Sequence, residues 1–227
     1  EVQDVPAIVK AAHNKGVAVA LDNTYAAGVM FDAFGHGVDV SIQALTKFVG
    51  GHSDLLLGSV SVRDAPAFEQ MGPIYRQLGL AVSPDDCSLA LRGLQTLALR
   101  LEQLEKSTLQ VAHWLADHPK IQAVFHPALA SCPGHDVWER DFTGSTSVFS
   151  IWFKDDVSPT QVEAVIDSLE LFQIGLSWGG VNSLAIVYPD VERPGQDYAG
   201  RLVRLNIGLE HTDDLIRDLK NALQTHF

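Results

Sequence analysis

The sequence contains little cysteine, few basic residues and no long apolar run. Cys87 and Cys132 are the only cysteines in 227 residues and have no CxxC spacing, so we predict two free thiols in a reducing compartment. Nothing approaches the run of about 20 apolar residues that a membrane span requires, and no charged leader precedes a short apolar segment. We therefore predict a cytoplasmic protein with neither a signal peptide nor a membrane partner.

Acidic residues outnumber basic ones by 28 to 16, which gives a formal net charge of −12. Binding to a phosphate backbone needs clustered lysine and arginine, so the composition argues against nucleic acid as a partner. Nine histidines are present, but there is no HExxH motif, and the spacing of His113 and His118 does not place them on one helical face. The sequence predicts no metal site.

The first half of the chain has the pattern of an α/β sheet. A helix that begins after the capping residue Asp4 and stops by Gly16 leads into an apolar run over residues 17–21. Such a run predicts a buried parallel strand, and it ends at Asp22. Further strands are predicted over residues 38–44 and 55–62. Short strands with brief connections are typical of the later portion of a larger α/β sheet.

The second half begins with a long helix and continues with alternating strands and helices. Ser83 is a capping residue, and leucines at helical spacing predict one helix that ends before Pro119. The strands and helices predicted beyond it are strands over residues 147–153, 184–188 and 201–207, and helices that begin at Ser158 and Thr212. A smaller α+β domain with a linking long helix is therefore expected from residue 94 to residue 227.

Asp22 and Lys47 are the candidate catalytic pair, because both follow predicted strands and ligands bind at that end of open α/β sheets. An aldehyde cofactor needs a lysine amine for imine formation and a carboxylate beside its ring nitrogen. These two residues supply both groups. By position alone, Lys47 could equally be a solvated lysine and Asp22 a helix cap.

Five sequence blocks extend this pattern over nearly the whole chain. They are Asp22–Tyr25, Thr46–Asp54, Leu91–Leu97, Ser177–Gly180 and Arg204–Glu210. In this order they resemble the signature of the Cys/Met-metabolism PLP-dependent enzymes. The resemblance implies an α/β fold of type I among PLP-dependent transferases, with pyridoxal 5'-phosphate as cofactor. Residues 1–93 would be the later part of the large, mixed-sheet domain that binds PLP.

The resemblance also implies a role for each matched residue. Lys47 would carry the cofactor as a Schiff base and move protons, Asp22 would pair with the pyridine nitrogen, and Thr46 would donate to the phosphate. Ser177 would help to position the lysine or the cofactor, and Arg204 would bind the substrate α-carboxylate. Ser177 and Trp178 would also contact the substrate. Simpler readings are a strand-end hydroxyl for Thr46, a turn residue for Ser177 and a surface ion-pair partner for Arg204.

Trp178 distinguishes branches within the family. The γ-cleaving relatives commonly have Glu-Ser-Leu-Gly-Gly at this point, whereas the chain has Leu176-Ser177-Trp178, which resembles the cystathionine β-lyase branch. Ala44 departs from the family, which often has a serine three residues before the lysine. For His52, fixing a tight glycine turn is favoured over a role as proton shuttle.

The activity implied is β-elimination of cystathionine to homocysteine, pyruvate and ammonia, within methionine biosynthesis. The alternatives are a related γ-lyase, a γ-synthase, a cysteine desulfhydrase, or a truncated chain without activity. A sulfur amino acid is the expected small-molecule substrate. The resemblance also implies self-association into a homotetramer with active sites shared between subunits. The phosphate loop, the ring-stacking aromatic and the residues that a neighbouring subunit lends to the site are expected upstream of Glu1.

Overall fold

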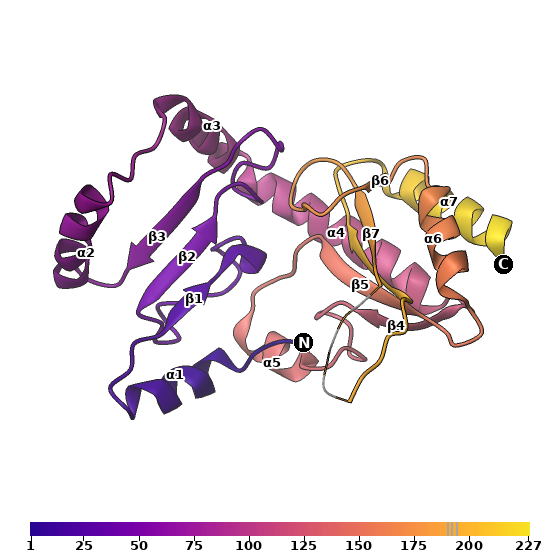
Figure 1. Cartoon of the computed structure of the whole chain (residues 1–227), viewed down its shortest axis with the longest axis horizontal. Coiled ribbons are helices and arrows are strands. Elements are labelled where there is room, and N and C mark those ends of the chain that lie inside the picture. The colour runs from indigo at the N-terminus through magenta and orange to yellow at the C-terminus, as the bar shows by residue number, and fades with distance from the viewer. Residues whose placement is uncertain (190, 192, 194) are drawn as a thin grey trace.

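The computed structural model describes residues 1–189, 191, 193 and 195–227, which form two sheets joined by a long helix (Figure 1). The first sheet has three strands in the order β1–β2–β3. β1 (Ala20–Asp22) pairs in parallel with β2 (Val40–Ala44), and β2 pairs antiparallel with β3 (Gly58–Val62). Before them, Asp4 caps α1 (Val5–His13) by accepting a hydrogen bond from the Ala7 amide, as predicted.

The predicted buried strand over residues 17–21 is wrong in extent and in burial. The strand comprises only residues 20–22, Val17 is 56% exposed, and Ala20 is exposed as well. Among the described residues, β1 pairs with β2 alone and lies at the edge of the sheet, so the run is not enclosed by strands on both sides. The one large apolar side chain of β1, Leu21, is partly buried against the hydrophobic cluster that includes Val38 and Leu101. The other two strands are shorter than predicted, because β2 begins at Val40 and β3 at Gly58.

α2 (Ala65–Gln77) is a helix that the sequence pattern did not predict. Asp64 caps it by accepting a hydrogen bond from the Ala67 amide, but Gly72 and Pro73 interrupt its pattern. None of its residues is buried, and Figure 1 shows the helix at the outer end of the first sheet.

The single long helix predicted from Ser83 towards Pro119 is in fact two helices. Ser83 caps α3 (Pro84–Gln95), and α4 (Leu97–Ala116) follows after a break at Thr96, whose φ of −109° is not helical. The break rotates the leucine stripe, so that Leu94 is 53% exposed and lies outside the core.

The second sheet has five strands in the order β4–β5–β8–β7–β6. The predicted strands and helices are all present, whereas β4, β6 and α5 were not predicted. The elements are β4 (Ile121–Phe125), α5 (His135–Asp141), β5 (Val148–Phe153), α6 (Pro159–Asp167), β6 (Gln173–Ile174), β7 (Leu184–Tyr188), β8 (Leu202–Asn206) and α7 (Thr212–His226).

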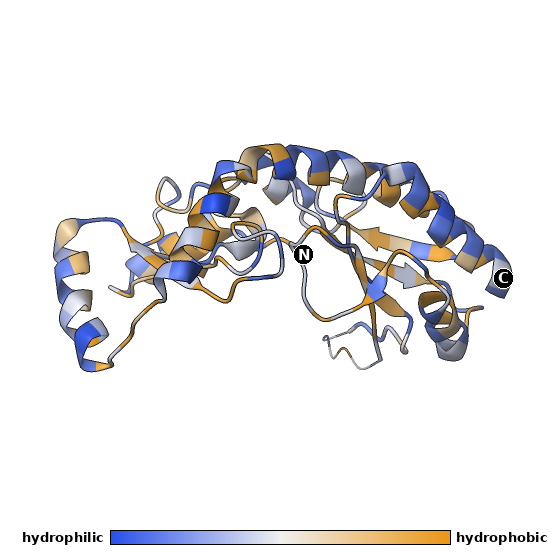
Figure 2. Cartoon of the chain, turned by 90° about the horizontal axis from the view of Figure 1, so that it is seen from above, coloured by the Kyte–Doolittle hydropathy of each residue, from blue (hydrophilic) through white to orange (hydrophobic). Residues whose placement is uncertain are grey.

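Side chains alternate across the second sheet, and this alternation directs two polar residues away from the core. Val203, Leu205 and Ile207 belong to the main hydrophobic cluster, which α4, α6 and α7 close on one face of the sheet. Arg204 and Asn206 therefore point to the opposite face. In Figure 2 the strands of this sheet are mostly hydrophobic, whereas the helices mix hydrophobic and hydrophilic positions.

α4 belongs to both hydrophobic clusters of the protein. Leu97, Leu101 and Leu104 pack with the first sheet, whereas Val111 and Leu115 pack beneath the second. The helix therefore fixes the two sheets relative to each other. The predicted division of the chain near Gly93 remains a proposal.

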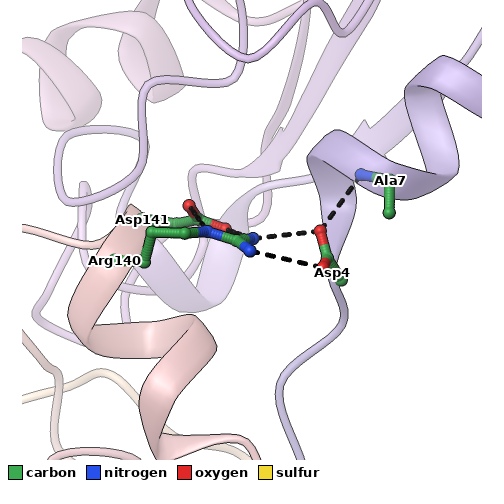
Figure 3. A network of polar contacts seen from close by, with 4 residues as sticks. All are labelled: Asp4, Ala7, Arg140 and Asp141. Carbon is green, nitrogen blue, oxygen red and sulfur yellow. Dashed lines mark hydrogen bonds and ion pairs between the residues drawn. The ribbon is translucent and has the colours of Figure 1, made fainter.

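The N-terminal helix is tied to α5 by an arginine (Figure 3). Arg140 donates to both carboxylate oxygens of Asp4, at 3.0 and 3.4 Å, and to Asp141. The hydrogen bond from Arg140 is the largest cause that lowers the pKa of Asp4. The start of the chain is thus held against the segment that leads into β5.

Two further observations bear on what the protein binds. Among the described helices, none combines the length and apolar character required to cross a bilayer. Within the same residues, no group of three or more histidine, cysteine, aspartate or glutamate side chains is placed to hold a metal ion. Cys87 is exposed, Cys132 is buried, and both are free.

His126 makes stability depend on pH. Its side chain is fully buried and contacts the Phe149 ring edge-on, and this burial lowers its pKa from 6.5 to about 4. Between pH 6.5 and 4, His126 is therefore mostly neutral in the folded state, whereas the same side chain is protonated in the unfolded state. We expect the free energy of unfolding to fall by about 3 kcal/mol from this group as the pH drops from 6.5 to 4.

Urea denaturation at several pH values would measure this effect. His126→Gln should remove most of the dependence between pH 6.5 and 4, whereas His211→Gln, at an exposed position, should preserve it. An identical pH dependence in wild type and His126→Gln would contradict the prediction.

Candidate active site

The candidate pair Asp22 and Lys47 lies at one edge of the first sheet. Asp22 is the last residue of β1, and Lys47 lies in the turn over residues 45–50 that follows the parallel strand β2. The Thr24 hydroxyl connects the two strand ends, because it donates to Asp22 Oδ1 at 2.5 Å and accepts from the Ala44 amide at 2.9 Å. Through Thr24, the Asp22 carboxylate at the end of β1 is held beside the end of β2, three residues before Lys47.

The amine of Lys47 meets the loop between β6 and β7. Its Nζ donates to Ser177 Oγ at 3.0 Å and lies 4.9 Å from the centroid of the Trp178 ring. Burial, and to a smaller extent the charge of Arg204, lowers the pKa of Lys47 below its usual 10.5. A lysine held in this way supplies neutral amine more readily than a solvated lysine does.

Gly179 lets the loop over residues 176–180 lie against the Lys47 turn. Its φ is +80°, and a Cβ atom there would lie 3.2 Å from Lys47 Cβ and from the Phe48 amide nitrogen. The buried side chain of Asn206 holds the loop from behind: its Oδ1 accepts from the Gly179 amide at 2.9 Å, and its Nδ2 donates to the Asn182 carbonyl. The loop therefore has its shape fixed from both sides.

Trp178 lies in an aromatic stack above the lysine. The Tyr25 ring lies nearly parallel to the Trp178 ring with centroids 4.4 Å apart, and Phe48 is tilted against Trp178 at 5.5 Å. Burial raises the pKa of Tyr25, so its hydroxyl remains protonated over a wide pH range. This stack forms an apolar wall beside the Lys47 amine.

Arg204 presents its guanidinium from β8 beside the same loop. Nη1 donates to the Tyr188 hydroxyl at 2.7 Å, and Nη2 donates to the Leu176 carbonyl at 2.6 Å. No carboxylate of the described residues forms an ion pair with it, so it offers an uncompensated positive charge near Lys47. Arg204 and Tyr25 also line an open cavity of about 910 Å³, whose lining includes neither Lys47 nor Ser177, so the cavity lies beside the candidate site rather than over the amine.

Thr46 and His52 contact the backbone of their own region. The Thr46 hydroxyl accepts from the Leu57 amide and donates to the Leu57 carbonyl, so donation to a phosphate requires it to leave that carbonyl. His52 Nδ1 lies 2.7 Å from the Gly50 carbonyl oxygen, in agreement with the predicted role in the glycine turn.

The arrangement fits a carbonyl cofactor such as PLP. A half-buried amine with a lowered pKa provides the nucleophile, a fixed carboxylate lies at the neighbouring strand end, and an uncompensated arginine lies across the loop. Lys47, Asp22 and Thr46 are the residues that would hold the cofactor. Ser177, Trp178 and Arg204 would face the substrate.

Comparison with known proteins defines the class and then the family. The model of the family "Cys/Met metabolism PLP-dependent enzyme" matches residues 1–224, and the chain belongs to this family. The prediction of family and cofactor from the five sequence blocks is thereby confirmed.

Individual relatives catalyse different reactions on related amino acids. The cystathionine beta-lyase of Escherichia coli is 44% identical over 96% of this chain, and that of Haemophilus influenzae is 39% identical over 99%. In structure, the cystathionine gamma synthase of Xanthomonas oryzae pv. oryzae matches with a TM-score of 0.91 and 31% identity over 99% of the chain. The predicted type I fold is confirmed by this match. The chain covers 57%, 58% and 59%, respectively, of these three proteins.

The sequence indicates the candidate site residues but not the neighbouring side chains that fix their positions. Lys47, Ser177, Trp178 and Arg204 come together as the resemblance implied. Asn206 lies within the Arg204–Glu210 block, but its role was not predictable from the sequence, because its partner Gly179 lies 27 residues away. The contact of Tyr188 with Arg204 had no sequence signal.

Proposed function

We propose that the full-length protein catalyses β-elimination of cystathionine. One cystathionine and one water become homocysteine, pyruvate and ammonia, as the Cα–H and Cβ–S bonds break and water supplies the keto oxygen of pyruvate. The observation that supports this most strongly is the convergence of Lys47, Ser177 and Trp178. Their contacts bring an amine of lowered pKa, a hydroxyl and an aromatic wall to one point.

Each residue of the site has a distinct task in this proposal. Lys47 takes the Cα proton, and Ser177 directs the amine by accepting its hydrogen bond at 3.0 Å. Arg204 binds the α-carboxylate through its planar fork and so aligns the Cα–H bond with the amine. PLP, when bound, supplies the ring that accepts the electron pair released at Cα. Asp22 provides the negative charge that keeps the ring nitrogen of PLP protonated.

The identity of the residue before Ser177 supports β- over γ-elimination. Leu176 occupies the position at which γ-cleaving enzymes commonly carry an acid, and its side chain is 70% exposed. γ-Elimination requires additional proton transfer at Cβ, and an apolar side chain cannot take part in it. The likeness to a γ-synthase structure is the specific observation that keeps a γ-type reaction as the second candidate.

Product analysis tests the proposal. The full-length protein loaded with PLP is incubated with cystathionine, and the keto acid and the thiol are both quantified. We expect equal amounts of pyruvate and homocysteine. Equal amounts of 2-oxobutyrate and cysteine would instead establish γ-elimination, and hydrogen sulfide formed faster from cysteine than homocysteine from cystathionine would establish a desulfhydrase.

We further propose that the protein works in the cytoplasm, in methionine biosynthesis, as a homotetramer with shared sites. Analytical ultracentrifugation of the full-length protein would report the number of subunits. The exposed apolar side chains of Ile42 in β2 and Val60 in β3, which are paired across the first sheet, support association with further protein surface.

A further inference from the structure

Arg100 is a buried arginine that is bound to the backbone of the Lys47 turn. Its side chain extends from the first turn of α4, and the residue is only 7% exposed. Nη1 donates to the Phe48 carbonyl at 2.6 Å, and Nη2 donates to the Val49 carbonyl at 3.2 Å. These carbonyls belong to the first and second residues after Lys47.

The same guanidinium also reaches the end of α3. Nη2 donates to the Gly93 carbonyl at 2.7 Å, and Nε donates to Thr96 Oγ1 at 3.1 Å. The planar guanidinium of Arg100 thus joins the Lys47 turn, the last turn of α3 and the start of α4. A lysine at this position has a single ammonium and cannot reproduce this pattern.

A charged group at this depth is costly without a partner, and in the described part of the chain no carboxylate pairs with Arg100. Burial lowers its pKa from the ordinary arginine value, as expected where the positive charge is disfavoured. Three carbonyl dipoles compensate the charge. The guanidinium is therefore bound by the shape of the turn rather than by an opposite charge.

The turn needs this partner, because its own hydrogen bonds leave the two carbonyls free. The Gly50 amide donates to the Leu45 carbonyl, and the Gly51 amide donates to the Lys47 carbonyl, each at 2.7 Å. α3 packs closely against this face of the turn: a Cβ atom on Gly93 would lie 2.1 Å from the Val49 carbonyl oxygen. Arg100 is thus the donor that satisfies this face of the turn.

We propose that Arg100 is a positioning residue that holds the Lys47 turn so that the lysine amine reaches Ser177 and the face of Trp178. This inference rests on the proposed role of Lys47 as the reactive lysine. It is independent of which sulfur amino acid is cleaved. Arg100 acts through Lys47 and touches neither cofactor nor substrate.

Arg63 provides a matched control. It also donates from Nη2 to two backbone carbonyls of the first sheet region, those of Phe34 at 3.2 Å and Val38 at 3.0 Å. Those carbonyls lie before β2, at the opposite end of that strand from Lys47. A general loss of backbone support should therefore appear in both Arg100→Met and Arg63→Met, whereas a loss of lysine positioning should appear only in Arg100→Met.

The first measurement needs neither cofactor nor substrate. The full-length protein without PLP is labelled competitively with acetic anhydride over a range of pH, and mass spectrometry of the Lys47 peptide gives the pKa of its amine. We expect the pKa of Lys47 to rise towards 10.5 in Arg100→Met and to be unchanged in Arg63→Met. Arg100→Lys, which retains the charge, should fold, and the pKa of Lys47 in it should lie between the values in the wild type and in Arg100→Met. If Arg100→Met does not fold, the pKa of Lys47 in Arg100→Lys tests the proposal.

The second measurement is steady-state kinetics of the PLP-loaded protein. We expect kcat to fall by about 10- to 100-fold in Arg100→Met, because a small displacement of a catalytic group has effects of this size, while KM changes less. Methylguanidine should restore part of kcat in Arg100→Ala. An unchanged pKa of Lys47 in folded Arg100→Met and Arg100→Lys, or equal shifts in the Arg63 control, would overturn the proposal. Failure of the wild type to cleave cystathionine would refute only the proposed reaction, since the labelling result stands alone.

Discussion

Replacement of Lys47 by alanine is expected to reduce turnover of the full-length protein by about 10⁴-fold or more, because the variant lacks both the nucleophilic amine and the proton acceptor at Cα. The amine of Lys47 contacts Ser177 and Trp178, and removal of the side chain leaves the turn's backbone hydrogen bonds in place. The fold should therefore survive. Pyruvate formation from cystathionine, measured with PLP in excess, reports the loss.

Two controls accompany the lysine variant. Lys15→Ala removes an exposed lysine next to the first helix and should retain wild-type activity. Addition of methylamine to Lys47→Ala should restore a measurable part of the activity, because a small amine can take the place of the missing group. Normal lyase activity in Lys47→Ala would refute the assignment of this residue.

Replacement of Arg204 by lysine is expected to lower kcat/KM for cystathionine by about 10²- to 10³-fold. Lysine retains the charge but loses the two parallel hydrogen bonds to a carboxylate, and a hydrogen bond to a charged group contributes about 1.5–3 kcal/mol. The effect should appear both as a higher KM and as a lower kcat, because the fork binds the carboxylate and also aligns the Cα–H bond with the amine. In the wild type, an analogue with an amide in place of the α-carboxylate should have a much lower kcat/KM than cystathionine. In Arg204→Lys the two values of kcat/KM should be closer to each other, and measuring both substrates with both proteins tests this.

Arg201 is the appropriate control for Arg204. It lies three residues earlier and forms an ion pair with Asp155, on the far side of β8 from the candidate site. Arg201→Lys should change kcat/KM by less than about 3-fold, since lysine can retain the ion pair. Equal losses in Arg201→Lys and Arg204→Lys would argue that the charge of β8, rather than the fork of Arg204, matters for the substrate.

The secondary structure was predictable wherever a local pattern determined it. Alternation located β8, and strand-like apolar runs located β5 and β7. Capping residues located α1, α3 and α6, and the acidic first turn with amphipathic spacing located α7. Burial of the run over residues 17–21 was not predictable, because it depends on which strands and helices lie beside β1. The break at Thr96 was missed since leucines continue at helical spacing on both sides of it.

The candidate site was predictable at the level of chemistry. Strand ends and motif blocks indicated Asp22, Lys47, Ser177 and Arg204. Thr24, which holds Asp22, lies two residues away, whereas Asn206, which holds the Gly179 loop, and Tyr188, which contacts Arg204, lie far away in sequence. A signal for Arg100 was nevertheless present. It stands three residues after Leu97, hence on the buried face of the helix, and a charged residue there requires an explanation.

The sharing of α4 by both hydrophobic clusters has a consequence for recombination between relatives. A crossover placed anywhere between Leu97 and Leu115 would join leucines selected for one sheet to side chains selected for another, on a single helix. Functional chimaeras should therefore inherit α4 whole from one parent. The link between α2 and α3, whose residues are exposed, is the natural point of exchange, and a parent's α4 should travel with that parent's second sheet.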